Sequence, residues 1–261
     1  MNAGERREEI LQLARTQGEM SVETLSEMLG VTASTIRRDL AKLTDSGELA
    51  RTYGGVIAVP TEAETTLAER SHEAPEVKRA IGSWCAKQVP AGSHVLLDAG
   101  TTTAQVARGL RETSPLSVVS TGLTSLQQMA DLEGVEFTLL GGRYRPVSQG
   151  FIGPITEAGL EKFTFDFAFL GADAVNAEDG VCEALPEQVR LKELMSRRAT
   201  HVFVVAHAEK LGQRPFHAWA DLGSGWTLVT DDSADPAQIT PFEDRGIAVV
   251  RVDQMGNAVQ N

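Results

Sequence analysis

Cysteine is nearly absent from this sequence, which has only Cys85 and Cys182 in a chain of 261 residues. The two lie far apart, so the sequence predicts neither a disulfide framework nor a cysteine-bound zinc ion, and it favours two reduced, partly buried thiols. No apolar run is long enough to span a bilayer, and the polar residues 1–9 are not those of a signal peptide. These absences predict a cytoplasmic protein without a membrane partner.

An excess of basic residues is also missing, because the formal net charge is −12 at pH 7. This charge argues against a protein that coats nucleic acid over its whole surface. It is compatible with a small DNA-reading module on an acidic body, since repulsion from the body is screened beyond roughly 8 Å at physiological salt. The histidines have no metal-ligand spacing, and we expect no metal and no cofactor. Hydrophobic residues make up 42% of the chain, enough for a core in one large or two smaller domains.

Residues 32–43 predict a short helix with one apolar and one polar face. Ile36, Leu40 and Leu43 recur at helical spacing, and Thr32 is the expected N-cap. Alone, the segment fits an ordinary surface helix with solvated arginines better than a DNA-reading helix. Its polar face nevertheless has the groups that a helix presents to the DNA major groove, hydroxyls for phosphates and guanidiniums for guanine or phosphate. The candidate DNA-binding residues on this face are Ser34, Thr35, Arg37 and Arg38.

The flanking segments favour the DNA-reading interpretation. Two further helices are predicted before this helix, and a glycine turn joins the second of them to it, as in a helix-turn-helix. Two β-prone runs around Gly54-Gly55 predict a small hairpin, the wing of a winged helix-turn-helix. Because the wing contacts the DNA backbone or minor groove, Arg51 and Tyr53 are further DNA-binding candidates. The predicted segments are helices 5–17 and 21–29 and the hairpin 49–59, within a DNA-binding domain over residues 1–59.

This domain resembles the N-terminal domain of the DeoR family, bacterial repressors of sugar-metabolism operons. The specific part is the Ile-Arg-Arg-Asp-Leu run at 36–40 with the downstream Gly54-Gly55. The resemblance implies that the polar face of helix 32–43 meets double-stranded operator DNA, and that Asp39 orients an arginine instead of reading a base. One helix-turn-helix covers a half-site, so we expect a homodimer or a higher even oligomer.

The rest of the chain predicts a second, α/β domain. Residues 60–75 lack periodicity and are interpreted as a linker, 76–253 as the second domain, and 254–261 as a frayed tail. Near-continuous apolar strands alternate with helices, which indicates a mostly parallel sheet covered on both faces. The expected strands are 94–98, 116–121, 135–140, 165–170, 201–206, 226–230 and 247–252, with helices at 76–89 and 187–199.

The ends of these strands carry the candidate effector-binding residues. Ligands of an open parallel sheet bind beyond the carboxyl ends of its strands. The loop 98–103 has a glycine and three threonines at a helix start, where hydroxyls and N–H groups can hold a phosphate, although a plain threonine-rich cap fits equally well. Aspartates and a lysine at neighbouring strand ends favour a phosphorylated, hydroxylated ligand. The set is Asp98, Gly100, Thr101, Thr102, Thr103, Gly141, Gly142, Gly171, Asp173 and Lys210.

The second domain also resembles the DeoR-family effector domain, which is similar to the ribose-5-phosphate isomerase fold. The set above matches the family pattern, as do Lys192 and Phe216. The departures lie near the expected sugar end of the ligand, and the phosphate-binding loop is unchanged. They are Gly122, where the family often has Asn, His207 and Glu209, where it has Asp and then Ser or Thr, and Cys182-Glu183, where it tends to have Thr.

The leading hypothesis is a repressor that a phosphorylated sugar releases from its operator, and two alternatives stay open. One is an aldose–ketose phosphate isomerase with an added DNA-binding domain, for which Asp98 and Asp173 would be the acid/base pair. The glycine-rich, lysine-bearing loop of similar isomerases is absent from 181–186, so we expect no enzymatic activity. The other alternative is a DNA-bound scaffold that has lost its ligand.

Overall fold

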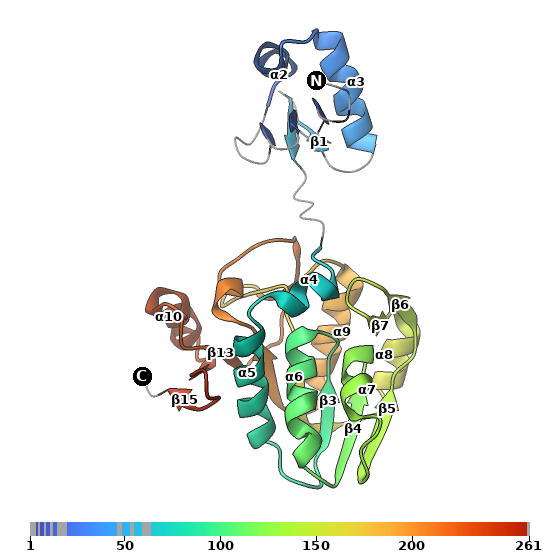
Figure 1. Ribbon diagram of the computed structural model, residues 1–261, viewed down its shortest axis with the longest axis vertical. Helices are drawn as coiled ribbons and strands as arrows, with labels where there is room; N and C mark the ends of the chain where they lie inside the picture. The colour runs from blue at the N-terminus through green and yellow to red at the C-terminus, as the bar shows by residue number, and fades with distance from the viewer. Residues whose placement is uncertain are drawn as a thin grey trace. The chain divides into compact units, whose positions relative to one another are not determined.

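The computed structural model describes residues 4, 6–7, 9–10, 13–14, 20–45, 49–52, 55–58 and 64–259, without the side chains of residues 45, 50, 51, 57 and 58. The chain divides into two compact units, Met1–Glu64 and Thr65–Asn261 (Figure 1). Each unit is described by itself below.

The first unit contains the expected helix-turn-helix and hairpin. Ser21 caps the first of the two helices, accepting a hydrogen bond from the Thr24 amide at 3.0 Å, and Gly30 ends it in the left-handed conformation at φ 63°. Thr32 accepts from the Thr35 amide at 3.4 Å, which confirms it as the cap of the next helix. The hairpin strands pair antiparallel. The elements are α2 (Val22–Leu29), α3 (Ala33–Asp45), β1 (Leu49–Arg51) and β2 (Val56–Ala58).

The apolar stripe of α3 packs into the core of this unit. Ile36, Leu40 and Leu43 are buried, together with Ile10 and Leu25. Of the expected first helix, only part lies among the described residues, and that part is helical. The predicted amphipathic pattern therefore fixes which face of α3 is left for solvent or a partner.

Arg6 and Asp39 connect the first helical segment to α3. The Arg6 Nε donates to Asp39 Oδ2 at 2.7 Å, and the exposed fractions of the two side chains are 12% and 5%. The prediction that Asp39 orients an arginine is confirmed, and the arginine is Arg6. A charge-assisted hydrogen bond with this little exposure holds α3 against the first helix.

The second unit is built on an eight-stranded sheet. Seven of its strands are parallel, and the edge strand β15 pairs antiparallel with β14. All seven expected strands are found, which confirms the predicted α/β class. In sheet order the strands are β15 (Ala258–Val259), β14 (Ala248–Val252), β13 (Trp226–Asp231), β11 (Ala199–Val205), β8 (Phe165–Leu170), β3 (His94–Leu97), β4 (Leu116–Ser120) and β5 (Val135–Leu139).

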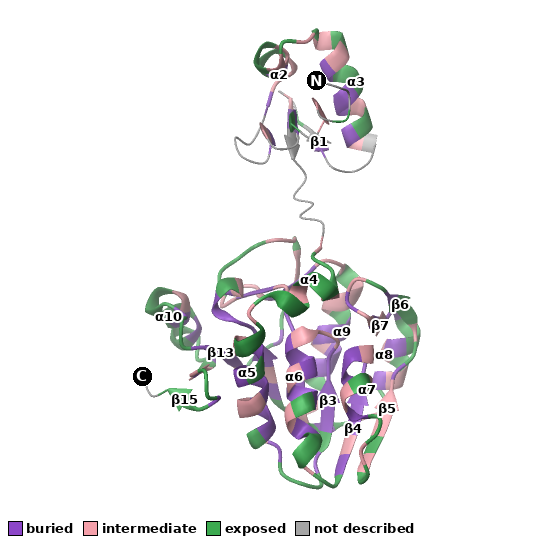
Figure 2. Cartoon of the chain, viewed as in Figure 1, coloured by how far each residue is buried: buried purple, intermediate pink, exposed green. Residues whose placement is uncertain are grey.

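Helices cover both faces of this sheet, and the central strands are buried between them (Figure 2). Val95 and Leu97 of β3 belong to one core with Ile81 and Val106, whereas Leu96 belongs to the other. Alternate residues of one strand thus serve opposite faces. One face has α5 (Pro75–Lys87), α6 (Thr101–Gly109) with η1 (Leu110–Glu112), and α7 (Leu123–Met129); the other has α8 (Pro154–Leu160), α9 (Pro186–Arg197) and α10 (Pro236–Asp244).

Several short elements beyond the carboxyl ends of the strands were not predicted. They are too brief to show a periodic pattern, and their contacts are with parts of the chain distant in sequence. The hairpin β6–β7 follows β5, and a small antiparallel sheet follows β8. These elements are β6 (Arg143–Arg145), β7 (Gly150–Ile152), β9 (Ala174–Asn176), β10 (Gly180–Glu183), β12 (Ala218–Ala220) and the 3-10 turn η2 (Ala208–Lys210).

Two expected boundaries differ in the structure. The linker predicted over 60–75 does not extend to 75, since residues from 65 on belong to the second unit and include the helix α4 (Leu67–His72). The tail predicted over 254–261 is also wrong in part, because its residues 258–259 form β15. The Asp253 carboxylate accepts from backbone amides at 2.9 Å and turns the chain back onto the edge of β14.

Candidate functional site

A cavity lies beyond the carboxyl ends of β3 and β8, at the edge of the sheet where the sequence predicts a ligand. It encloses about 620 Å³, including its open mouth. Loops, the hairpin β6–β7, and helices α4, α6 and α9 supply its wall. The lining residues are Arg70, Asp98, Ala99, Gly100, Thr101, Thr102, Thr121, Ser148, Gly150, Phe151, Ile152, Gly171, Ala172, Asp173, Glu183, Gln188, Leu191, Lys192 and Lys210.

A buried cluster of three charges forms one side of this cavity. The Lys192 ammonium donates to Asp98 Oδ2, and it lies 2.8 Å from Glu183 Oε1. Asp98 also accepts from the Gly171 amide at 3.0 Å and from the Ala99 amide at 2.8 Å. Both oxygens of Asp98 are therefore engaged by the protein, and the ammonium is shared between two carboxylates.

One ammonium between two carboxylates leaves an excess of negative charge in this cluster. Burial raises the pKa of Glu183 to about 7, against the pull of Lys192, and the charges of Asp173 and Asp98 raise it further. The two carboxylates raise the pKa of Lys192, which stays an ammonium despite its burial. A proton on Glu183 near neutral pH would relieve the repulsion within the cluster.

The start of α6 provides the second side of the cavity. Gly100 precedes the helix with no side-chain cap, so the first-turn N–H groups lack a capping partner from a side chain. Thr101 and Thr102 line the cavity beside these groups. Thr103 does not, because it is fully buried and its hydroxyl donates to the Gly100 carbonyl at 3.1 Å. Two of the three predicted threonines thus lie where an anion would meet the helix N-terminus.

Cationic side chains also line the cavity. Lys210 donates to the Ala172 carbonyl at 2.6 Å, and burial lowers its pKa. Arg70 pairs with Asp173 Oδ1 at 3.0 Å and donates to the Val147 carbonyl at 3.2 Å. With Lys192, these cations balance the three carboxylates that line the cavity, so a bound anion would meet a wall that is not net acidic.

Three side-chain oxygen atoms in the cavity wall are buried and have no hydrogen-bond partner among the described residues. They are Thr121 Oγ1, Asp173 Oδ2 and Gln188 Oε1. Each can accept a hydrogen bond, and unpaired buried acceptors are costly. Their partners would be hydroxyl or amino donors of a ligand, or water.

The structure brings together most of the predicted effector residues, but not the pair Gly141 and Gly142. These glycines lie outside the cavity wall. The Thr156 hydroxyl donates to the Gly141 carbonyl at 2.9 Å, and a Cβ on Gly142 would lie 2.1 Å from that hydroxyl oxygen. Gly142, at φ 155°, is thus needed for close packing against α8.

Several cavity residues were not predicted from the sequence. The most important is Arg70, which lies within the predicted linker 60–75. A signal was present: Thr66 and Glu69 have the spacing of a capping box, which predicts a helix start. Both reciprocal bonds of that box are formed. Glu183 was noted only as a departure, and Thr121, Ser148 and Gln188 carried no pattern that singled them out.

Two of the departures from the family pattern, Gly122 and His207, are placed by the structure. A Cβ at Gly122 would lie 2.7 Å from the Ala99 Cα, so the cavity loop and the start of α7 pack too closely for a side chain. His207 is buried outside the cavity wall, and burial, followed by the charges of Lys210 and Lys78, lowers its pKa to about 4. It is a neutral imidazole at physiological pH.

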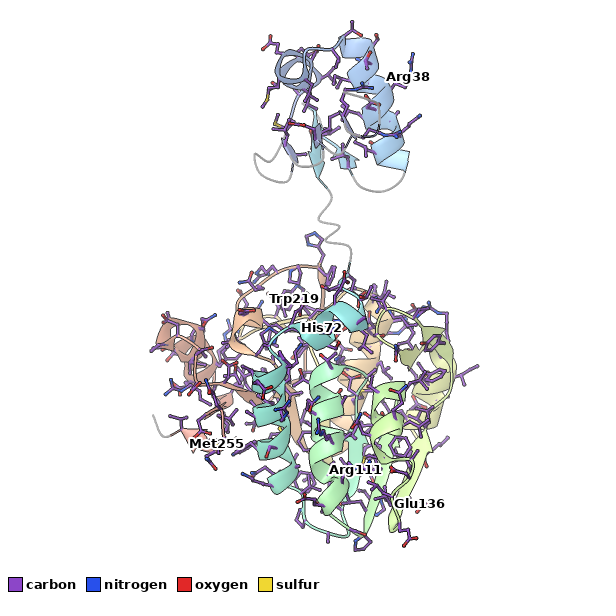
Figure 3. The ribbon with its side chains drawn as sticks, viewed as in Figure 1. Arg38, His72, Arg111, Glu136, Trp219 and Met255 are labelled. Atoms are coloured by element: carbon purple, nitrogen blue, oxygen red, sulfur yellow. The ribbon has the colours of Figure 1, made fainter. Side chains whose placement is uncertain are left out.

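The predicted DNA-reading face of α3 is open to solvent in the first unit. Ser34, Arg37 and Arg38 are exposed, and Thr35 is half-buried. Arg38 extends from α3 away from the rest of its unit (Figure 3). The Arg51 side chain and Tyr53 lie outside the described residues, so their placement at the wing stays a prediction.

Within the described ranges, no helix is long and apolar enough to cross a membrane. The same ranges contain no cluster of three or more His, Cys, Asp or Glu side chains arranged to hold a metal ion. Cys85 and Cys182 are both free and buried.

Comparison with known proteins gives matches along nearly the whole chain. A model of the DeoR C terminal sensor domain matches residues 73–232, and one of the DeoR-like helix-turn-helix domain matches residues 6–62. The HTH-type transcriptional regulator GlpR of Haloferax volcanii is 35% identical over 254 residues, 96% of this chain and 98% of the relative. The glycerol-3-phosphate regulon repressor of Escherichia coli is 30% identical over 224 residues, 86% of this chain and 88% of the relative.

Among solved structures, a ribose 5-phosphate isomerase A from Methanocaldococcus jannaschii aligns with 52% of this chain and 54% of its own length. The TM-score is 0.38 and the sequence identity is 17%.

Proposed function

Because the chain belongs to the DeoR family of transcriptional regulators, we propose that it is a repressor whose α3 reads operator DNA and whose cavity takes a phosphorylated sugar as inducer. Binding of the sugar phosphate releases the operator. The observation that carries the proposal is the cavity itself. It joins a helix start with no side-chain cap and cationic side chains to buried acceptors that have no partner among the described residues.

The phosphate of the inducer occupies the side of the cavity at the start of α6. Backbone N–H groups there, with the hydroxyls of Thr101 and Thr102, suit an anion. Lys210 lines the same cavity, and its ammonium is a phosphate partner. The glycerol-3-phosphate regulon repressor of E. coli, similar to this chain, is named for a regulon of a small phosphorylated polyol.

The hydroxylated part of the inducer meets the buried acceptors of the cavity wall. Asp173 Oδ2 and Gln188 Oε1 each lack a partner among the described residues, and each can accept from a hydroxyl. Asp98, assigned to a sugar hydroxyl from the sequence, has a different main role: it holds Lys192 and the backbone of the cavity loops. Asp173 therefore keeps the hydroxyl contact expected of it, and Gln188 takes the contact expected of Asp98.

The DNA contact belongs to the exposed face of α3. Ser34, Thr35, Arg37 and Arg38 leave the buried stripe free to hold the helix in its unit. The operator is double-stranded, and two half-sites require two copies of the chain, so the repressor is a homodimer or a higher even oligomer. Its place of action is the cytoplasm, where the operator and sugar phosphates are both found.

An isomerase activity is not part of the proposal. Proton transfer between adjacent carbons requires a carboxylate that can reach the substrate. Both oxygens of Asp98 already accept protein hydrogen bonds, so Asp173, whose Oδ1 is paired with Arg70, has no second free carboxylate as its partner in the acid/base pair. The cavity thus fits binding of a sugar phosphate better than its chemical conversion.

Calorimetry and thermal unfolding with a panel of phosphates test the proposal. The panel contains glycerol 3-phosphate, glyceraldehyde 3-phosphate, ribose 5-phosphate and fructose 6-phosphate, each beside its unphosphorylated counterpart. We expect at least one phosphate to stabilise the protein, by about 2.7 kcal/mol at a hundredfold excess over its Kd, and its counterpart to have no effect. Absence of binding across the panel would contradict the inducer assignment.

A further inference from the structure

The short helix α4 is held to the second unit by polar contacts. None of its side chains is buried, so apolar packing contributes little to its position. The Leu67 amide donates to the Val147 carbonyl at 2.9 Å, and Arg70 donates to the same carbonyl at 3.2 Å. Lys78 of α5 donates to the Arg70 carbonyl. Because α4 is held by a few hydrogen bonds, a change in one of these bonds markedly changes how stably the helix is docked.

Arg70 links this helix to the cavity. Of α4, whose residues are all described, only Arg70 lines the cavity. Its guanidinium lies 3.0 Å from Asp173 Oδ1, while Asp173 Oδ2 is buried with no partner among the described residues. Asp173 thus binds Arg70 of α4 through one carboxylate oxygen and leaves its other oxygen for a ligand.

The helix α4 lies where the chain enters the second unit. The second unit begins at Thr65, and α4 begins at Leu67. The chain therefore passes from the DNA-binding unit into α4 before it reaches any other element of the second unit. Of the described elements of the second unit, α4 is therefore the one nearest in sequence to the DNA-binding unit.

We propose that Arg70 and Asp173 make α4 a ligand-responsive latch, in which the sugar phosphate contacts both side chains and strengthens the hold on α4. This inference rests on the proposed function and adds to it the route of coupling. A ligand hydroxyl donates to Asp173 Oδ2 and the ligand anion lies near the Arg70 guanidinium. Both contacts require α4 to be docked, so ligand binding favours the docked helix by mass action.

Charge around α4 supports this direction. Arg70, Lys78 and Lys210 are close enough for their charges to interact, and burial, followed by Lys210, lowers the pKa of Lys78 to about 8. An anion in the cavity relieves the repulsion among these cations. It thereby strengthens the hydrogen bond from Arg70 to the Val147 carbonyl and the one from Lys78 to the Arg70 carbonyl, which hold α4. The empty cavity therefore holds α4 less firmly than the occupied one.

Hydrogen exchange of the full-length protein tests the latch. Arg70→Gln is compared with the wild type and with Arg79→Gln, a control in which an exposed arginine of α5 is changed. Without added phosphate, we expect the amides of α4 to exchange about tenfold faster in Arg70→Gln and at the wild-type rate in the control. Amides of α5 report whether the fold is intact. Unchanged exchange of α4 in Arg70→Gln would overturn the latch.

The second arm adds each of the four panel phosphates, and inorganic phosphate as the minimal anion. We expect the phosphate that stabilises the wild type to slow exchange of α4 in the wild type but not in Arg70→Gln. The same phosphate should release operator DNA from the wild type at a lower concentration than from Arg70→Gln. Arg70→Lys keeps the charge without the paired N–H groups and should restore part of the response. Equal slowing in Arg70→Gln and wild type would also overturn the latch.

The two proposals fail in different ways. If no panel phosphate stabilises the wild type, the inducer assignment fails, and exchange without phosphate still measures whether Arg70 holds α4. If a phosphate stabilises the wild type and leaves exchange of α4 unchanged, the inducer assignment stands and the latch is overturned.

Discussion

The ammonium of Lys192 lies 2.8 Å from Oε1 of Glu183, inside a wall where both side chains are almost fully buried. Lys192 also donates to Asp98, so it alone faces two carboxylates. Gln188 donates to the other oxygen of Glu183 at 2.8 Å, and Asp173 adds further negative charge. This arrangement, above all the burial of the carboxyl, raises the pKa of Glu183 to about 7.

Glu183→Gln should alter the dependence of stability on pH. Burial raises the pKa of Glu183 from its ordinary 4.5 to about 7, so between these values the folded protein binds a proton that the unfolded chain has lost. The free energy of unfolding of the wild type therefore falls as pH rises through this window, by up to about 3 kcal/mol. Glu183→Gln has no such loss.

Urea unfolding from pH 4.5 to 8 measures this difference, with Glu161→Gln, a change of an exposed glutamate, as the control. We expect the stability of Glu183→Gln relative to wild type to increase with pH and that of the control to stay level. A difference that does not vary with pH would show that Glu183 titrates as in the unfolded chain.

Asp39→Asn should weaken the first unit. It removes the charge that holds Arg6 at 2.7 Å and leaves a guanidinium with 12% exposure facing a neutral amide. We expect a loss of about 2 kcal/mol of stability in this unit, and weaker operator binding because α3 is less firmly held. Glu27→Gln, on the exposed side of α2, is the control. If Asp39→Asn unfolds like the wild type, the ion pair contributes nothing to the stability of the first unit.

Much of this fold follows from the sequence because periodic elements carry their own signal. The stripe Ile36, Leu40 and Leu43 and the apolar strands were predicted with boundaries within about two residues of those found. Short elements such as β6, β7 and β12 were not, since contacts distant in sequence determine them. A residue such as Gln188 enters the cavity wall only because α9 packs beside β10, which no local pattern reveals.

The residues of the candidate site were likewise predictable from the sequence only in part. Asp98, Thr101, Thr102, Asp173 and Lys210 follow predicted strands, and a parallel sheet brings such positions to one edge. The same reasoning groups Gly142 with them, whereas in the structure Gly142 lies outside the cavity wall and packs against Thr156, because a glycine needed for packing has the same sequence signature as one needed for a ligand.

Arg37→Ala and Arg38→Ala should weaken operator binding. A guanidinium that reads a base contributes about 1–3 kcal/mol, and its loss relaxes sequence preference at one position. A guanidinium that contacts phosphate instead weakens binding to every sequence and lowers the salt dependence. Fluorescence anisotropy with operator and scrambled DNA at several salt concentrations separates the two cases. Wild-type affinity in both folded variants would contradict the assignment of α3.

The assembly should contain an even number of chains. Symmetric operators present two half-sites, and a single helix-turn-helix covers one. Light scattering at micromolar concentration should therefore give a dimer or a higher even oligomer, alone and on the operator. A monomer that still binds a two-site operator tightly would contradict this expectation.

The central claim is that a sugar phosphate in the cavity competes with operator DNA, and titration of operator-bound protein with the panel phosphates tests it most directly. Thr102→Val removes a cavity hydroxyl at nearly constant volume, and Thr103→Val removes a buried hydroxyl that donates to the Gly100 carbonyl. We predict that one phosphate lowers operator affinity about tenfold or more in the wild type and in Thr103→Val. Thr102→Val and Lys210→Ala should bind the operator normally and resist release. Release of Thr102→Val at wild-type concentrations, or no release of the wild type by any phosphate, would contradict the claim.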